Sequence, residues 1–171
     1  MLEDVFRKLN RHVNVSHETF DRLCVYHNLL LKWQSKVNLI GPDTIADSWN
    51  RHFLDSLQLL NMLPNLQSRI ADLGSGAGFP GMVLAIAGAE HMHIIESDTK
   101  KVLFLKEVAR VTHTNIFIHH CRIEDHPIND VAVVISRACS NLKKLFSLSL
   151  NYVSHETICL FPKGKNYSIE I

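Results

Sequence analysis

Four of the chain's seven glycines lie between Ile70 and Gly81, directly behind a short apolar run. The segment reads Ile-Ala-Asp-Leu-Gly-Ser-Gly-Ala-Gly-Phe-Pro-Gly, so that a carboxylate, Asp72, stands just before the glycines. Glycine lets the backbone approach a ligand closely and adopt positive φ, and a helix that starts near Pro80 adds unpaired N–H groups. This combination is typical of a loop that cradles a nucleotide-like cofactor.

Two cofactors compete for this loop. Gly76-x-Gly78-x-x-Gly81 fits the dinucleotide pattern, with Glu96 twenty residues after Gly76 as the ribose-binding acid. Asp72 argues against a dinucleotide, because its carboxylate would repel a pyrophosphate but attract the cationic amino-acid end of S-adenosylmethionine. Glu96 could bind the ribose of either cofactor. We favour S-adenosylmethionine, both over a dinucleotide and over a turn without ligand, since so many glycines cost chain entropy with no packing in return.

The elements that must position these residues follow a strand–helix alternation. Short apolar runs predict strands over residues 70–73, 91–96, 115–120, 131–136 and 157–161, and helical patterns fill 80–87, 100–111 and 142–152. The fold class is therefore α/β, with a parallel sheet and helices on both faces. Ligand sites in such sheets lie at the carboxyl ends of the strands. Candidate functional residues fall at or just after these ends: Asp72, Glu96, Glu124 and Arg137.

The first 65 residues read as helical. Ser16 can cap a helix that reaches about Lys36, and Gly41-Pro42-Asp43 breaks the chain before a second helix that ends at Pro64. We therefore predict an N-terminal helical cap over 1–65 and a cofactor-binding domain over 66–171. With 171 residues, 46% of them hydrophobic, the chain can bury one good core.

Composition excludes several classes of protein. No apolar run is long enough for a membrane span, and the acidic N-terminus lacks the features of a signal peptide. The four cysteines form no C-x-x-C motif, and no H-E-x-x-H motif occurs, so we expect no disulfide framework, no metal site and a cytoplasmic protein. The net charge of +1 gives no global basic field. Five basic residues could still form a local basic face, or could simply be solvated side chains: Arg137, Lys143, Lys144, Lys163 and Lys165.

Taken together, the motifs resemble one family. In order along the chain stand Trp33, Asn38-Leu39, His52-Phe-Leu-Asp-Ser-Leu (52–57), Asp-Leu-Gly-Ser-Gly-Ala-Gly-Phe-Pro-Gly (72–81), Glu-Ser-x-x-Lys-Lys-x-x-Phe-Leu (96–105), Arg-x-Glu (122–124), Ser-Arg-Ala (136–138) and Lys-Gly (163–164). From about Leu30 to Lys165 this resembles the bacterial small-subunit rRNA methyltransferases of the RsmG type, also called GidB. The resemblance implies a Rossmann-like class I S-adenosylmethionine-dependent methyltransferase fold. For this chain we expect five strands in the order 3-2-1-4-5, without the terminal strands usual in the family.

The resemblance also implies a reaction and a set of site residues. The reaction is methyl transfer from S-adenosylmethionine to N7 of one guanine in 16S rRNA of the small ribosomal subunit. The methionine and ribose portions would contact Gly74, Gly76, Gly78 and Phe79, with Glu96 on the ribose and Ile123 and Glu124 beside the adenine. Arg137 would face the cofactor or the target base, with Asn38 and His52 as further active-site candidates and Lys163 and Lys165 as RNA contacts. His52 and Asp55 could instead form a structural hydrogen bond that pins the helical segment.

The residues present agree with N7 as the acceptor. Guanine N7 carries a lone pair and no proton, so its methylation needs positioning and electrostatics but no general base. No Asn/Asp-Pro-Pro-Tyr motif follows the fourth strand, which disfavours exocyclic amino groups, and Cys139 lacks the preceding proline of a cytosine nucleophile. Arg137 could hold the guanine O6, or it could pair with Asp72 or Glu124.

Two other functions stay open at this point. The chain could methylate another RNA or a small molecule, with the helical N-terminal part as a substrate cap. It could also be a catalytically silent S-adenosylmethionine-binding or ribosome-binding relative. We expect a monomer in each case.

Overall fold

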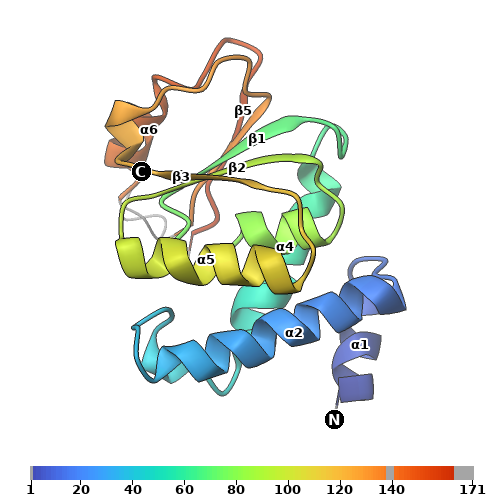
Figure 1. The fold of residues 1–171 in the computed structure, drawn as a ribbon. Coiled ribbons are helices and arrows are strands. Elements are labelled where there is room, and N and C mark those ends of the chain that lie inside the picture. The colour runs from blue at the N-terminus through green and yellow to red at the C-terminus, as the bar shows by residue number, and fades with distance from the viewer. Residues whose placement is uncertain (1, 138–140, 164–171) are drawn as a thin grey trace.

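The computed structural model describes residues 2–137 and 141–163, and its centre is a five-stranded parallel sheet (Figure 1). The strands are β1 (Arg69–Leu73), β2 (His91–Glu96), β3 (Phe117–His120), β4 (Val133–Ile135) and β5 (Ile158–Leu160). Their order is β3-β2-β1-β4-β5, and every neighbouring pair is parallel. The predicted strands and their order are therefore confirmed.

Helices cover both faces of this sheet. On one face lie α4 (Gly81–Ile86) and α5 (Thr99–Val111), and α6 (Leu142–Ser149) lies beyond the other (Figure 1). The strand β4 is wholly buried, as is β1 after its first residue. Burial on both faces explains why these strands read as continuous apolar runs rather than as an alternating pattern. The helix α6 ends at Ser149, three residues before the predicted end at 152.

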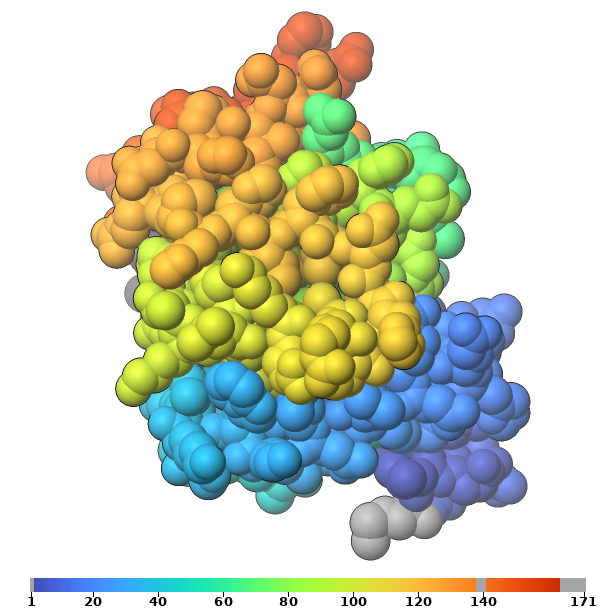
Figure 2. All heavy atoms as spheres, viewed as in Figure 1, coloured from blue at the N-terminus to red at the C-terminus, as the bar shows by residue number. Residues whose placement is uncertain are grey.

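The N-terminal helices form a further layer beneath α4 and α5. The short α1 (Leu2–Asn10) leads to α2 (His17–Gln34), and the Ser16 side chain accepts a hydrogen bond from the Thr19 N–H at 3.1 Å, which confirms the predicted cap. Figure 2 shows α2, in blue, lying directly against α5, in yellow. The N-terminal helices therefore pack directly on the helices that cover the sheet.

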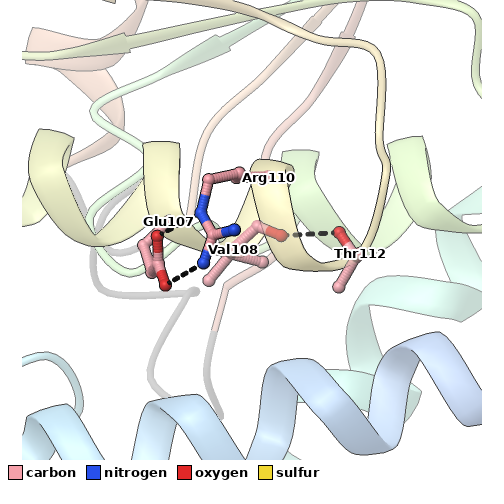
Figure 3. Close-up of polar contacts among 4 residues, drawn as sticks. All are labelled: Glu107, Val108, Arg110 and Thr112. Carbon is pink, nitrogen blue, oxygen red and sulfur yellow. Dashed lines mark hydrogen bonds and ion pairs between the residues drawn. The ribbon is translucent and has the colours of Figure 1, made fainter.

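A single arginine ties α2 to the end of α5. Arg22 Nε donates to the carbonyl of Thr112 at 2.9 Å, and its Nη2 donates to the hydroxyl of Thr114 at 3.0 Å. The Thr112 hydroxyl in turn donates to the Val108 carbonyl at 2.7 Å (Figure 3). The Val108 carbonyl thus accepts from both the backbone N–H and the hydroxyl of Thr112, and the Thr112 carbonyl, just beyond the end of α5, accepts from α2. On the exposed side of the same turn, Glu107 and Arg110 form a two-pronged ion pair (Figure 3).

The prediction of one continuous helix between residues 41 and 64 is wrong. The structure has a 3-10 turn (Pro42–Thr44), a π-helical stretch (Trp49–Leu54), one turn of α-helix as α3 (Asp55–Leu57) and a second 3-10 segment (Gln58–Met62). The apolar residues at spacings of three and four still point inward. Their packing is tertiary: the ring of Trp49 lies 4.7 Å from His27 on α2 and 4.6 Å from Phe53. Local spacing does not encode such contacts, and they override the regular helix.

One buried cluster joins the N-terminal layer to the sheet. Its centre is Tyr26 of α2, which is fully buried with its ring 5.1 Å from Phe53, 5.4 Å from Phe79 and 6.1 Å from Phe104. The Tyr26 hydroxyl donates a hydrogen bond to the carbonyl of Ala77 in the glycine loop. The division into 1–65 and 66–171 stays a prediction, and the core crosses it.

Three observations bear on the excluded classes. None of the helices within 2–137 and 141–163 is both long and apolar enough to cross a bilayer. In those ranges no three His, Cys, Asp or Glu side chains come together in a way that could hold a metal ion. Three cysteines, Cys24, Cys121 and Cys159, are free thiols, and Cys139 lies outside the described residues.

A stack of rings on β2 and β3 predicts sensitivity to acid. The ring of His93 lies 4.6 Å from Phe117 and 5.2 Å from His119, with His93 Nδ1 3.0 Å from His119 Nε2. Burial and the neighbouring positive charges lower the pKa of His93 to about 4, and burial also lowers the pKa of His119. The unfolded chain, where histidine titrates near 6.5, therefore binds more protons between about pH 6.5 and 4.

It follows that the histidine stack should make the free energy of unfolding decrease as the pH falls through this window. Urea unfolding at pH 7 and pH 5 measures the decrease, and His93→Asn should make it smaller. Asp72, whose pKa burial raises to about 6, acts in the opposite direction but equally in both proteins, so it cancels in the comparison. An identical loss of stability in the wild type and in His93→Asn would contradict this assignment.

Candidate functional site

A cavity of about 510 Å³ opens at the carboxyl ends of the strands. The loop after β1, the end of β2 and the turn after β3 form its wall, together with Arg137, two residues beyond the end of β4. Residues 39–41 and His52 close it from the N-terminal segment. Parallel sheets place their ligand sites at this edge, so the topology and the cavity agree.

Two glycines of the loop, Gly76 and Gly78, differ in why a side chain is disfavoured at their positions. Gly76 has φ +62°, and an added Cβ would meet nothing within 4 Å, because the position faces open space beside the cavity. Gly78 has φ +97°, and an added Cβ would come within 2.7 Å of the Tyr26 hydroxyl oxygen and 2.9 Å of Leu105 Cδ2. The expectation that the glycines bring no packing in return is therefore wrong for Gly78. It is absent from the cavity wall and lets the loop approach α2 and α5.

Asp72 lies fully buried beneath the loop. Its Oδ2 accepts a hydrogen bond from the Gly81 N–H at 2.9 Å, whereas its Oδ1 has no partner, and neither has the buried hydroxyl of Ser75. Burial raises the pKa of Asp72 to about 6, and the Ser75 hydroxyl and the Gly81 N–H oppose this rise. Since Oδ1 and the Ser75 hydroxyl make no hydrogen bond of regular geometry, Oδ1 can accept from a further donor. Asp72 is not part of the cavity wall, so its direct contact with a ligand stays a prediction.

Glu96 ends β2 with both carboxylate oxygens on the backbone of neighbouring turns. Oε2 accepts from the Gly76 N–H and Oε1 from the Asp98 N–H, each at 2.8 Å. An ionised carboxylate has about four lone-pair sites, so each oxygen keeps acceptor capacity toward the cavity that Glu96 lines. This arrangement fits a pair of neighbouring hydroxyls.

Arg137 lines the cavity beside Phe79 of the glycine loop and is held by the N-terminal segment. Its Nη1 donates to the Arg51 carbonyl at 2.8 Å, its Nη2 lies 2.8 Å from His52 Nδ1, and its Cζ lies 5.1 Å from the ring centre of Phe79. Among the described residues no ion pair within 4 Å joins Arg137 to Asp72 or Glu124, although the charge of Asp72 does favour the charged guanidinium. A role for Arg137 in shaping the cofactor pocket through these acids stays a prediction.

His52 makes a further contact between the N-terminal segment and the rest of the chain, through Arg137. Burial and the charges of Arg137 and Arg51 lower its pKa to about 4, so the ring is neutral near pH 7. The expected hydrogen bond from His52 to Asp55 is absent among the described contacts, and His52 bonds to Thr44 instead, at 2.8 Å. A structural link between the helical segment and the sheet does exist, but it runs through Arg137.

The remaining predicted residues are divided among three places. Ile123 and Glu124 line the cavity from the short turn after β3, where the Tyr152 hydroxyl donates to the Ile123 carbonyl at 2.6 Å. Asn38 is exposed and off the wall. Of the basic residues, Lys144 lines this cavity, Lys143 is exposed on α6, Lys163 lines a second cavity of about 960 Å³, and Lys165 lies outside the described residues.

Sequence reasoning missed the segment next to Asn38. Leu39, Ile40 and Gly41 line the cavity, and the Gln34 side chain holds them: its Oε1 accepts from the N–H groups of Leu39 and Ile40 at 3.0 Å each. The local signals were the chain break at Gly41 and the Asn38-Leu39 pair, of which only Asn38 was taken as a site residue. A loop of this kind carries no periodicity that could mark it as part of a site.

Comparison with known proteins gives consistent matches over nearly the whole chain. The family model described as rRNA small subunit methyltransferase G, GidB, matches residues 19–171. A protein of Paramagnetospirillum magneticum named ribosomal RNA small subunit methyltransferase G is 46% identical over 157 residues, which are 92% of this chain and 77% of that protein. A protein of the same name from Orientia tsutsugamushi (strain Ikeda) is 42% identical over 171 residues, 100% of this chain and 85% of the relative.

Among solved structures, a ribosomal protein L11 methylase from Lactobacillus delbrueckii subsp. bulgaricus superimposes with a TM-score of 0.56 at 12% identity. The match covers 65% of this chain and 58% of the other. At this identity the likeness concerns the fold, and it confirms the predicted Rossmann-like class I methyltransferase architecture.

Proposed function

Because the chain belongs to the rRNA small subunit methyltransferase G family, we propose that it methylates N7 of a guanine in the 16S rRNA of the small ribosomal subunit. Family membership makes it an rRNA methyltransferase with S-adenosylmethionine as donor. The guanine N7 and the roles of individual residues are our proposal. The observation that carries the residue roles is the glycine loop above a buried carboxylate whose Oδ1 makes no hydrogen bond, together with a His52 ring whose Nδ1 is occupied by Arg137.

The residues of the cradle fit the donor. Asp72 Oδ1, buried without a partner, suits the ammonium group, and Glu96 suits the two ribose hydroxyls. Gly74, Gly76 and Phe79 would flank the methionine and ribose portions, and the turn at Ile123 and Glu124 would flank the adenine. When bound, S-adenosylmethionine supplies a methyl group on a positively charged sulfur.

The part of the cavity that His52 and Arg137 line suits an acceptor that needs no deprotonation. His52 is the cavity's one neutral imidazole among the described residues, and its Nδ1 faces a guanidinium donor, so no imidazole lone pair points into the cavity. Guanine N7 has no proton to lose and is compatible with such a wall. Arg137, a donor only, is placed to hold a carbonyl oxygen of the base and so to fix its orientation.

The decisive experiment is methyl transfer to small subunits that lack the modification, with radiolabelled S-adenosylmethionine. We expect label on N7 of one guanine of 16S rRNA. Label only on another RNA or a small molecule would replace the proposal by the first alternative, and cofactor binding without transfer would replace it by the silent relative. Parallel reactions with naked rRNA identify the particle that is the true acceptor.

Glu96→Gln should weaken cofactor binding by about 10- to 100-fold, the usual effect of losing hydrogen bonds to a charged group. The amide nitrogen of glutamine cannot accept from a backbone N–H, so either Gly76 or Asp98 would face a second donor. Isothermal titration calorimetry gives the Kd, with the exposed Glu156→Gln as the charge-matched control. An unchanged Kd in Glu96→Gln would remove Glu96 from the ribose site.

The proposal extends to partners and location. We propose that the protein acts as a monomer in the cytoplasm, with residues 1–65 as a helical cap and 66–171 as the cofactor-binding domain. Lys144, which lines the cavity, and the basic residues Lys143, Lys163 and Lys165 would contact RNA phosphates. Asn38, exposed beside the wall, is a further candidate for RNA contact.

A further inference from the structure

A line of hydrogen bonds runs from the N-terminal wall of the cavity to Arg137. Thr44 Oγ1 donates to the Gly41 carbonyl at 2.7 Å and lies 2.8 Å from His52 Nε2. On the other side of the ring, His52 Nδ1 lies 2.8 Å from Arg137 Nη2. Gly41, His52 and Arg137 all line the cavity, whereas Thr44 stands behind it.

The direction of every bond in this line follows from the groups themselves. A guanidinium can only donate, so His52 Nδ1 must accept from Arg137. The threonine hydroxyl has one proton, which goes to the Gly41 carbonyl, so Thr44 Oγ1 must accept from His52. The neutral imidazole therefore carries its proton on Nε2, and both neighbours demand the same tautomer.

We propose that Thr44 is a positioning residue for methyl transfer: it keeps the His52 proton on Nε2, so that Nδ1 can hold the Arg137 guanidinium at the cavity wall. This inference rests on the proposed function for its effect on the reaction. Nothing in the motifs marks Thr44, since its contact with His52 arises only in the folded segment. Without the hydroxyl, the tautomer with the proton on Nδ1 becomes accessible, and that proton would face a second donor and release Arg137.

The same hydrogen bonds connect Arg137 with residues 39–41 of the cavity wall. Residues 39–41 form part of the cavity wall, and Thr44 holds their end through the Gly41 carbonyl, which also accepts from the Thr44 N–H at 2.9 Å. Thr44 thereby couples two walls that come from segments far apart in the sequence. The backbone bond survives replacement of the side chain, so a hydroxyl-free variant keeps the turn and loses the two hydroxyl contacts, with the Gly41 carbonyl and with His52 Nε2.

The test compares Thr44→Val with Thr44→Ser. We expect Thr44→Val to lower kcat on rRNA about tenfold, with little change in the Kd of S-adenosylmethionine, and Thr44→Ser to restore kcat because it keeps the hydroxyl. Nitrogen-15 NMR of the imidazoles in the free protein should show His52 protonated on Nε2 in the wild type and in Thr44→Ser. In Thr44→Val we expect a mixture of tautomers.

The two readouts separate this inference from the proposed function. The tautomer is measured without substrate, so an unchanged Nε2–H tautomer in Thr44→Val overturns the role of Thr44 whatever the substrate is. A wild type that labels no rRNA overturns the proposed function, and the tautomer then still decides whether Thr44 holds the His52–Arg137 pair. Equal loss of kcat in Thr44→Val and Thr44→Ser would assign Thr44 a structural role and reject positioning through the hydroxyl.

Discussion

Replacing Arg137 by alanine should lower kcat for rRNA methylation on the order of 100-fold while the protein stays folded. The guanidinium is held at the cavity wall by the Arg51 carbonyl, by His52 Nδ1 and by the face of Phe79. These three contacts fix its position before any substrate arrives, as a group that orients a base requires. Its removal should misplace the acceptor nitrogen more than it weakens cofactor binding, because the hydrogen bonds that hold Glu96 and the Gly76 N–H do not involve Arg137.

Three measurements define this result. Methyl transfer to unmodified small subunits gives kcat, calorimetry gives the Kd of S-adenosylmethionine, and circular dichroism reports the fold. Arg137→Lys is the matched control, since lysine keeps the charge but lacks the planar fork that serves two partners, and it should recover only part of the activity. Wild-type turnover in Arg137→Ala would remove Arg137 from the mechanism.

Replacing Gly78 by alanine should cost about 3 kcal/mol of the free energy of unfolding, from overpacking together with a backbone that disfavours a side chain. At φ +97° the new Cβ would lie 2.7 Å from the Tyr26 hydroxyl oxygen, 2.8 Å from Met82 Cβ and 2.9 Å from Leu105 Cδ2. All three neighbours are fully buried and cannot move aside cheaply. Urea unfolding measures the loss.

Gly76 offers the matched control in the same loop. It also has positive φ, at +62°, but an added Cβ would meet nothing within 4 Å, so Gly76→Ala should pay only the backbone strain of about 1 kcal/mol. A loss in Gly78→Ala no greater than in Gly76→Ala would show that the contact with α2 and α5 does not restrict position 78.

The features that could be predicted from the sequence are those with a local cause. Apolar runs of a few residues located each of the five strands to within two residues at either end, and the hydroxyl of Ser16 marked the start of α2. The cofactor class and the place of Glu96 followed from the motif around the glycines. The strand order and the place of the turn at Ile123 beside the cavity followed from the family resemblance.

The features that could not be predicted depend on residues distant in the chain. The partner of Arg137 is His52, 85 positions earlier, and the partner of the Ala77 carbonyl is Tyr26, 51 positions earlier. Asp72 and Glu124, the acids of the neighbouring motifs, were the natural candidates for a partner of Arg137. In the fold, however, its guanidinium bonds to the N-terminal helical segment. The irregular path from Pro42 to Met62 has the same origin, since ring packing against α2 decides it.

The hydrogen bond from the Tyr26 hydroxyl to the Ala77 carbonyl has a consequence for how this enzyme can be divided. The donor-binding domain cannot be used as an autonomous module. Without α2, its glycine loop would lose Tyr26, whose hydroxyl bonds the Ala77 carbonyl and whose ring stacks on Phe79. Grafts, fusions or truncations that aim to keep donor affinity must therefore carry the first two helices with them.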